Sequence, residues 1–447
     1  MEDLETKQPE KESENISEAQ NLGSHHPDGG WRAWSVVLGL VIAILHLWAS
    51  RNSFRTNFSP TNVFYLRYAN AYGVYNDYYV RNYLRDRYSS SQISWIGSVQ
   101  LFLVLSGGLV AGRGYDTGYF YHLMIGGSLL FVFCLFMLSL THAGQYYQVF
   151  LSHGLGVGIA TGLSYVPGMA VLSQYFERRR PIAMGIATTG SAVGGVLHPI
   201  MLNKLFYGPA GFHGGVRASA GLCLGLLAIA LLLLRPRFRP TKGQISTTAV
   251  FNNFLRDPPY VIMVCGTTLI YTGLYFPIFF LQLNAIKIGI NANLAFYTIA
   301  ILNGASVFGR IFPNMLVNSV GVFNMVILCT TITGILVFCP LAIKDVAGTM
   351  IFSVMYGFFS GAYAGLVSPM ISSLARNNSE IGARLGICFT FTGIGGLVGT
   401  PISGALLQGS FIWWRPFLFS GVCVFMGTLC FVVSRYLVSK VKGTHIL

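Results

Sequence analysis

The chain of 447 residues is 53% hydrophobic and only 10% charged, whereas a soluble globular domain carries about 25% charged residues. This composition excludes an ordinary water-soluble protein and places most of the chain in lipid. The net charge of +14 would suggest a nucleic-acid partner for a soluble protein, but in a membrane protein the placement of the cations matters more than their sum, and we expect no such partner.

The amino-terminal segment is polar. Seven acidic residues and two lysines precede Pro27, and no long apolar run separates them. Such a segment cannot bury enough apolar surface to fold, and it lacks the hydrophobic core of a signal peptide. We expect residues 1–30 to form a disordered acidic cytoplasmic tail.

Twelve apolar runs follow, each near the ~20 residues that span the hydrocarbon of a bilayer. Lipid offers no hydrogen bonds to a bare backbone, so runs of this length must be helices. The predicted helices cover residues 34–50, 93–111, 123–140, 147–172, 181–202, 218–234, 259–283, 293–317, 320–343, 347–374, 385–407 and 416–434. The fold class is therefore an all-α membrane protein.

The distribution of Lys and Arg predicts the orientation. With the amino terminus inside, fifteen cations from the second helix onward fall on the cytoplasmic side and five on the opposite side. Because cytoplasmic loops retain Lys and Arg, both termini should be cytoplasmic. The basic stretch 235–258 then links a first bundle of six helices (31–234) to a second (259–436), and 437–447 forms a cytoplasmic tail.

The two bundles share landmarks. A Gly-x4-Gly-Arg pattern ends at Arg113 in the second helix and recurs at Arg310 in the eighth, 197 residues later. A Gly-Gly pair with a following proline in the fifth helix recurs in the eleventh, and a proline in the fourth recurs in the tenth, at offsets of 201 to 202. We therefore predict twelve transmembrane helices in two pseudo-symmetric six-helix bundles around a midplane cavity, which is how secondary transporters are built.

The loop after the first helix departs from this pattern. Six arginines lie between the first two helices, where the topology predicts few cations, and the first helix is only seventeen residues long. The polar, aromatic run from residue 70 looks like the outer end of a helix. We infer that residues 51–69 interrupt the first helix, either as a true extracellular loop or as a translated intron left by an imperfect gene model.

Two segments resemble a known family. PDGGWRAW, from Pro27 to Trp34, and YFERRRPIAMGIATTGS, from Tyr175 to Ser191, resemble the two signatures of the monocarboxylate transporters, closest in style to their fungal branch. Compared with the family signature, the segment from Pro27 to Trp34 carries one extra residue, Arg32. The resemblance implies the major facilitator fold and a secondary transporter that moves a monocarboxylate or related organic anion by alternating access. That family also carries larger aromatic and vitamin-like solutes.

The signatures also indicate gating or structural residues. Glycines spaced three to five residues apart along the fifth helix leave a groove in which a neighbouring helix can approach closely. Asp116 after Arg113 resembles a degenerate form of the cytoplasmic loop motif of the major facilitator superfamily, and we expect a gate latch there. The full set of gating or structural candidates is Asp28, Trp31, Trp34, Arg113, Asp116, Arg178, Arg179, Gly185 and Gly190.

Arg310 has two interpretations. A guanidinium inside a membrane span is costly unless it is paired or hydrated, so it indicates a functional site. In the resembled family, the arginine of the eighth helix meets the substrate carboxylate, and an acid one turn earlier takes part in proton coupling. Here Ser306 stands one turn earlier and Asn303 two turns earlier. Arg310 also repeats Arg113 in the internal sequence repeat. Two interpretations of Arg310 therefore stand side by side, a structural latch and a binding residue for an anion.

Polar and aromatic residues at mid-span are the other candidates for contact with a solute. We expect the seventh helix to break near Pro277, exposing its neighbours to the cavity. The substrate-binding candidates are Arg310, Asn303, Ser306, Tyr271, Tyr275, Asn70 and Tyr72.

The placement of the acids bears on energy coupling. After Asp28, every acidic residue lies in a predicted loop, whereas intramembrane carboxylates are the usual proton relays. Proton coupling would therefore run through a histidine in a span, namely His46, His153 or His198. Facilitated diffusion competes with symport, and we expect no cofactor.

The sequence gives less support to other classes of function. The sequence has no Cys/His cluster, no paired intramembrane carboxylates and no GxxxxGK[ST] motif, so we predict neither an enzyme nor a metal site. The alternatives to an anion carrier are a facilitative permease for an aromatic or vitamin-like solute and a sensor that binds solute without moving it. We expect a monomer in the plasma membrane, whose partners are its solute and the lipid bilayer.

Overall fold

The computed structural model describes residues 74–76, 78–84, 87–88, 90–172, 174–176, 179–233, 254–375, 380–407 and 412–442. The first predicted helix (34–50) and the interrupting segment (51–69) lie outside these residues. So do the predicted site residues Asp28, Trp31, Trp34, Asn70, Tyr72 and Arg178, together with the side chain of Asp116.

The described part of the chain is built from helices. The first half contains a π-helical segment η1 (Tyr79–Tyr83), α4 (Ser90–Asp116), α5 (Phe120–Leu138), α6 (Tyr146–Val149), the π-helical η2 (Phe150–Gly156), α7 (Val157–Leu172), α8 (Arg180–Phe206) and α9 (Gly211–Leu233). The second half contains α11 (Pro258–Lys287), α12 (Ala292–Val320), α13 (Val322–Phe338), the 3-10 turn η3 (Cys339–Leu341), α14 (Val346–Ser373), α15 (Ile381–Leu407) and α16 (Trp414–Lys442).

These helices match the apolar runs of the sequence. Within the described residues, eleven helical stretches are long and apolar enough to cross a membrane, with α6, η2 and α7 joined as one. Each overlaps one of the predicted second to twelfth helices, although α16 continues to Lys442. Proline stands in the first turn of α8 and of α11, where its missing N–H leaves no hydrogen bond unmade.

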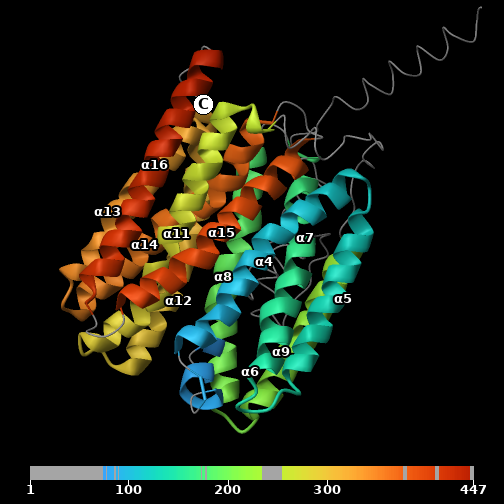
Figure 1. The fold of residues 1–447 in the computed structure, drawn as a ribbon, viewed down its shortest axis with the longest axis vertical. Coiled ribbons are helices and arrows are strands. Elements are labelled where there is room, and N and C mark those ends of the chain that lie inside the picture. Colours follow the sequence, from blue (N-terminus) through green and yellow to red (C-terminus); the bar gives the residue numbers. More distant parts are fainter. Residues whose placement is uncertain are drawn as a thin grey trace, which may run out of the picture.

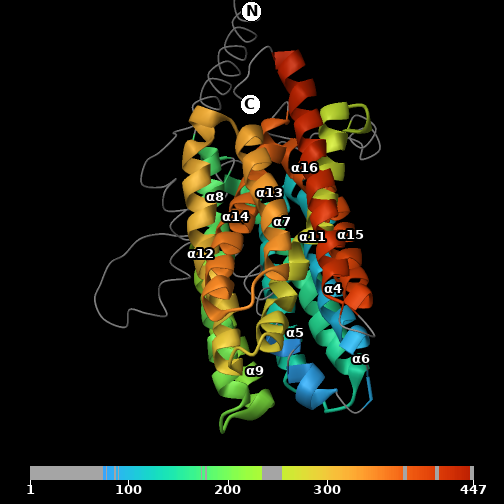
Figure 2. The ribbon, with the colours of Figure 1, turned by 90° about the vertical axis from the view of Figure 1, so that its left-hand side faces the viewer.

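The two halves pack along two seams. One seam joins α4 to α15, and the other joins α8 to α12 and α14 (Figure 1). The view in Figure 2 shows α8 and α12 running side by side along the long axis. Each seam therefore pairs helices that are far apart in the sequence, so the centre of the molecule receives residues from both halves.

Close glycine contacts repeat in the two halves at one offset. In the first half Gly162 of α7 approaches Gly107 of α4, and in the second half Gly365 of α14 approaches Arg310 of α12. The members of these pairs are 203 positions apart. Gly118 and Gly321, which turn the chain into α5 and α13 with φ of 90° and 93°, are also 203 apart. Such positive φ angles favour glycine.

This offset corrects the predicted equivalence of Arg113 and Arg310. Arg113 lies exposed in the last turn of α4, five residues before Gly118, whereas Arg310 is buried eleven residues before Gly321. The structural counterpart of Arg310 in α4 is Gly107. The Gly-x4-Gly-Arg echo is thus out of register with the repeat that the turn glycines define.

The predicted break at Pro277 is also wrong. α11 continues through Pro277 to Lys287. A proline inside a membrane helix is tolerated when neighbouring helices support the backbone around it. α16 packs closely at this point, because its Ser420 backbone lies directly against Gly273, one turn before the proline.

Candidate substrate site

Arg310 occupies the seam between α12 and α8. Its side chain is buried, and its Nη1 donates hydrogen bonds to the carbonyl oxygen of Thr188 and to the hydroxyl of Ser191, both on α8. Its Nε has no hydrogen-bond partner, and its Nη2 bonds to no described residue. No described acid forms an ion pair with it. The guanidinium therefore keeps its charge and one fork of donors uncompensated.

Tyrosines from both halves lie in the neighbourhood of this cation. Tyr165 of α7 and Tyr271 and Tyr275 of α11 lie close enough to the Arg310 guanidinium to interact with it electrostatically. The ring of Tyr271 lies 5.7 Å from that of Tyr275 and 6.0 Å from that of Tyr363 on α14. The Tyr363 hydroxyl is fully buried and has no hydrogen-bond partner. We call Arg310 and these four tyrosines the central cluster.

The two polar residues that precede Arg310 on α12 differ in their contacts. Asn303 donates from Nδ2 to the carbonyl of Ile299 at 3.0 Å and to the carbonyl of Gly195 on α8 at 3.5 Å. Ser306 is buried with an unpartnered hydroxyl, and a Cβ placed at Gly361 of α14 would lie 2.7 Å from its Cα. Asn303 thus helps to join the seam, while the Ser306 hydroxyl adds an unsatisfied donor near Arg310.

Glycines allow α8 to lie against α12. A Cβ placed at Gly185 would lie 2.6 Å from the Arg310 carbonyl oxygen, and one at Gly195 would lie 2.9 Å from Asn303. Gly190 is buried on the same helix. This is the close approach that the glycine spacing predicts. Arg179, just before α8, is exposed.

The two predicted proton carriers within the described residues are held by hydrogen bonds. His153 lies in the π-helical η2, fully buried, and its Nδ1 is 2.9 Å from the hydroxyl of Tyr79. The ring of Tyr75 packs edge-on against it at 4.6 Å. His198 Nε2 lies 2.9 Å from the hydroxyl of Ser219 on α9. Both imidazoles therefore sit in packed parts of the first half, and neither of these bonds involves the central cluster.

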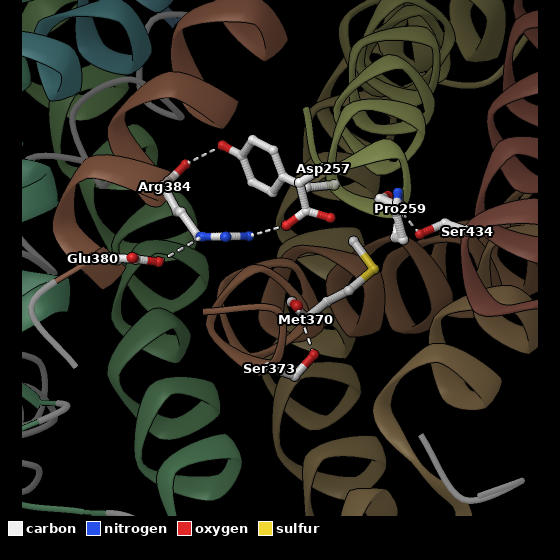
Figure 3. Close-up of polar contacts among 8 residues, drawn as sticks. Asp257, Pro259, Met370, Ser373, Glu380, Arg384 and Ser434 are labelled. Atoms are coloured by element: carbon white, nitrogen blue, oxygen red, sulfur yellow. Dashed lines mark hydrogen bonds and ion pairs between the residues drawn. The ribbon is translucent and has the colours of Figure 1, made fainter. Parts of the chain in front are cut away.

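A second charged cluster joins the beginnings of α11 and α15 (Figure 3). Arg384 is 2% exposed, and its guanidinium lies 3.0 Å from Asp257 and 3.4 Å from Glu380. It also lies over the rings of Phe254 and Tyr260, at 4.9 Å and 5.0 Å from their centroids. We call Arg384, Asp257 and Glu380 the ion-pair cluster.

Sequence reasoning missed several of these residues. It counted Arg384 only among the fifteen cations of the cytoplasmic side, although the spacing of Glu380 and Arg384 is that of an ion pair along one helix. It also missed Thr188 and Ser191, whose small side chains gave no signal beyond their place among the glycines of α8. Tyr165 and Tyr363 were indistinguishable from the many other aromatic residues of the spans.

The sequence is similar to those of known proteins. The sequence model of the Major Facilitator Superfamily matches residues 37–325. The aspyridones efflux protein of Emericella nidulans is 36% identical over 91% of this chain and 78% of its own length. The agnestins efflux protein of Paecilomyces divaricatus is 35% identical over 82% and 83%, and the fujikurins efflux protein of Gibberella fujikuroi is 35% identical over 93% and 84%.

Solved structures share the fold. The human organic anion transporter MFSD10 superposes with a TM-score of 0.66 at 11% identity, over 89% of this chain and 99% of its own. The transporter FucP, in its outward conformation, superposes with a TM-score of 0.64 at 14% identity, over 84% and 97%. At such low sequence identity, these similarities show only that the helices are arranged in the same fold.

Proposed function

Because the chain belongs to the Major Facilitator Superfamily and is an integral, multi-pass membrane transporter, we propose that it exports an aromatic organic anion that binds Arg310 between the two halves. Alternating access would expose this site to one side of the membrane at a time. We further propose that the protein lies in the plasma membrane with both termini in the cytoplasm.

The observation that carries the proposal is the free fork of Arg310. Nη1 is engaged by Thr188 and Ser191, which fixes the plane of the guanidinium, while Nε and Nη2 remain without described partners. These two nitrogens form the edge that receives a carboxylate through two parallel hydrogen bonds. A buried cation at mid-membrane is costly, and a bound anion would offset that cost.

The tyrosines favour an aromatic anion over a small aliphatic one. Four phenol rings from α7, α11 and α14 make up the rest of the central cluster, and stacked or edge-on ring contacts add to the affinity of an aromatic ligand. The hydroxyls of Tyr363 and Ser306 would be available to a hydroxyl or carbonyl group of the solute.

Export is the direction that the relatives favour. Three relatives at 35 to 36% identity are named as efflux proteins, each for a different compound. The shared word supports outward transport, while the different compounds leave the identity of the solute to experiment.

The test is transport by purified protein in proteoliposomes. We expect saturable flux of labelled salicylate or benzoate, with weaker flux of acetate and pyruvate. Arg310→Ala should reduce salicylate flux at least about 100-fold, and Arg310→Lys should reduce it about tenfold, because lysine keeps the charge but lacks the fork. Inside-out and right-side-out vesicles give the direction, and two external pH values distinguish proton coupling from facilitated diffusion.

Two results would overturn the proposal. Flux of these acids that survives Arg310→Ala would remove the anion anchor. Salicylate binding that Arg310→Ala abolishes, without flux in wild-type protein, would instead identify a solute sensor.

A further inference from the structure

We propose that Arg384 is a positioning residue for transport, which fixes the first two turns of α15 so that they form the seam with α4 of the other half. The inference rests on the proposed transport function. It concerns the contacts of α15 with the start of α11 and with α4, whereas Arg310 lies between α12 and α8.

On one face, the ion-pair cluster joins α15 to the start of α11, which is itself hydrogen-bonded to α16. Asp257 directly precedes the proline that starts α11, and Ser434 of α16 donates to the carbonyl of Pro259 at 2.7 Å. The Tyr260 hydroxyl donates to the backbone carbonyl of Arg384 at 2.7 Å. Arg384 is therefore held through both its side chain and its backbone (Figure 3).

On the other face, the same turns of α15 contact α4. A Cβ placed at Gly112 would lie 2.7 Å from the carbonyl oxygen of Gly382, and one placed at Gly386 would lie 2.5 Å from that of Gly108. Both α15 glycines are two positions from Arg384 along the chain. The first two turns of α15 are thus held by the ion-pair cluster on the α11 side and in backbone contact on the α4 side, where the spacing leaves no room for a side chain.

Removing the guanidinium would disturb this arrangement. The side chains of Asp257 and Glu380 are only 17% and 27% exposed, and Arg384 lies between them. Without the cation, two partly desolvated carboxylates would repel each other across the α11–α15 junction. The start of α15 would then move relative to α11, and the α4 seam would lose its register.

The location of the ion-pair cluster predicts which step of the transport cycle its loss would slow. Asp257, Glu380 and Arg384 all belong to the second half, so their ion pairs persist when the two halves move against each other. The cluster is therefore not a latch between the halves. Its loss should impair the closing of the α4–α15 seam, which sets the turnover rate, and should leave the affinity of the Arg310 site unchanged.

The first experiment separates turnover from binding in purified protein. Arg384→Gln should lower the maximal rate of salicylate transport about tenfold and leave the salicylate dissociation constant within about twofold. The charge-reversed double variant Asp257→Arg with Arg384→Asp should recover at least about half of the rate. Lys440→Gln is the matched control, because it removes an exposed cation from α16.

The second experiment measures the distance between α4 and α15 by cross-linking, in the absence of any substrate. The Thr390 hydroxyl of α15 donates to the carbonyl of Ser106 on α4 at 3.4 Å, so cysteines at these two positions should be joined by a short bifunctional thiol reagent. The exposed native Cys265 is replaced by serine in this background. Arg384→Gln should reduce the cross-linked fraction at least about threefold, and the charge-reversed pair should restore it.

The outcomes are distinguishable. If wild-type protein neither binds nor moves salicylate, the proposed function fails, while the cross-linking result still decides the role of Arg384. Equal cross-linking in Arg384→Gln and Lys440→Gln would overturn the inference, as would a raised dissociation constant with an unchanged maximal rate. If Arg384→Gln does not fold, the charge-reversed pair decides, since a folded pair with a weak cross-link contradicts the inference.

Discussion

The two seams between the halves share one packing scheme and differ in their chemistry. Gly185 of α8 lies against the backbone of Arg310 on α12, and Gly386 of α15 lies against the backbone of Gly108 on α4. Ten residues later on α8 and α15, Gly195 lies against Asn303 of α12, and Gly396 lies against Leu101 of α4. Glycine allows the close approach in both seams. Among the described residues, Arg310 donates hydrogen bonds across the α8–α12 seam, whereas Arg384 of α15 is paired with Asp257 and Glu380 on the α11 side, away from α4.

This difference separates two requirements of a transporter. Movement of the halves requires smooth, close helix contacts, and the repeated glycines supply them in both seams. Recognition of an anion requires one charge without a paired acid, and Arg310 of the α8–α12 seam supplies it. The α4–α15 seam, with Gly107 where α12 has Arg310, therefore serves as a natural reference for what packing alone contributes.

Beyond the loss expected for Arg310→Ala, the largest effect is expected from filling the glycine contact between α15 and α4. Gly386→Val should reduce transport by about 10- to 100-fold, because its Cβ would lie 2.5 Å from the Gly108 carbonyl oxygen and overpacking costs about 1–3 kcal/mol. Gly404→Val on the same helix is the control, since a Cβ there meets no described atom within 4 Å. Flux in proteoliposomes measures the effect, and equal flux in the two variants would mean that the seam does not need this close contact.

A smaller effect is expected in the polar seam. Ser191→Ala should raise the half-saturating salicylate concentration about tenfold, because a hydrogen bond to a charged group contributes about 1.5–3 kcal/mol and here it orients Arg310. Ser353→Ala is the control, since the buried Ser353 hydroxyl donates to the Thr349 carbonyl of its own helix, α14. An unchanged half-saturation in Ser191→Ala would show that Thr188 alone holds the guanidinium.

The fold was predictable to a large degree. Spans of about 20 apolar residues allow few alternatives in lipid, so eleven helices overlap their predicted runs. The register of the repeat was not predictable from the Gly-Arg pattern, because a residue letter does not report backbone conformation. Gly118 and Gly321 carry the true register through their positive φ angles.

The site was predictable only in part. Arg310 stood out because an arginine inside a span is rare, and Tyr271 and Tyr275 lie in its cluster. Ser191 and Thr188 come from a helix about 120 residues away, and membrane hydroxyls usually bond within their own helix, as Thr188 also does. Arg384 looked like a surface cation, because its burial depends on Asp257, 127 positions away.

An intermediate effect is expected at an unsatisfied hydroxyl of the central cluster. Tyr363→Phe should weaken salicylate binding about threefold while leaving thermal stability unchanged or higher, because a buried hydroxyl without a partner costs about 1–3 kcal/mol. Tyr356→Phe, which loses a hydrogen bond to the Leu274 carbonyl at 2.8 Å, should show the opposite pattern of lower stability and unchanged binding. Lower stability in Tyr363→Phe would assign its hydroxyl to the core.

The smallest effect is expected at the arginine that the sequence pairs with Arg310. Arg113→Ala should change flux by less than about twofold, because an exposed cation at a helix end interacts weakly with its surroundings. The same substitution at Arg310 is expected to reduce flux at least about 100-fold, so the two variants compare an exposed and a buried arginine of one sequence pattern. Similar losses in the two variants would restore the latch interpretation of both residues and remove the reason to place the substrate in the α8–α12 seam.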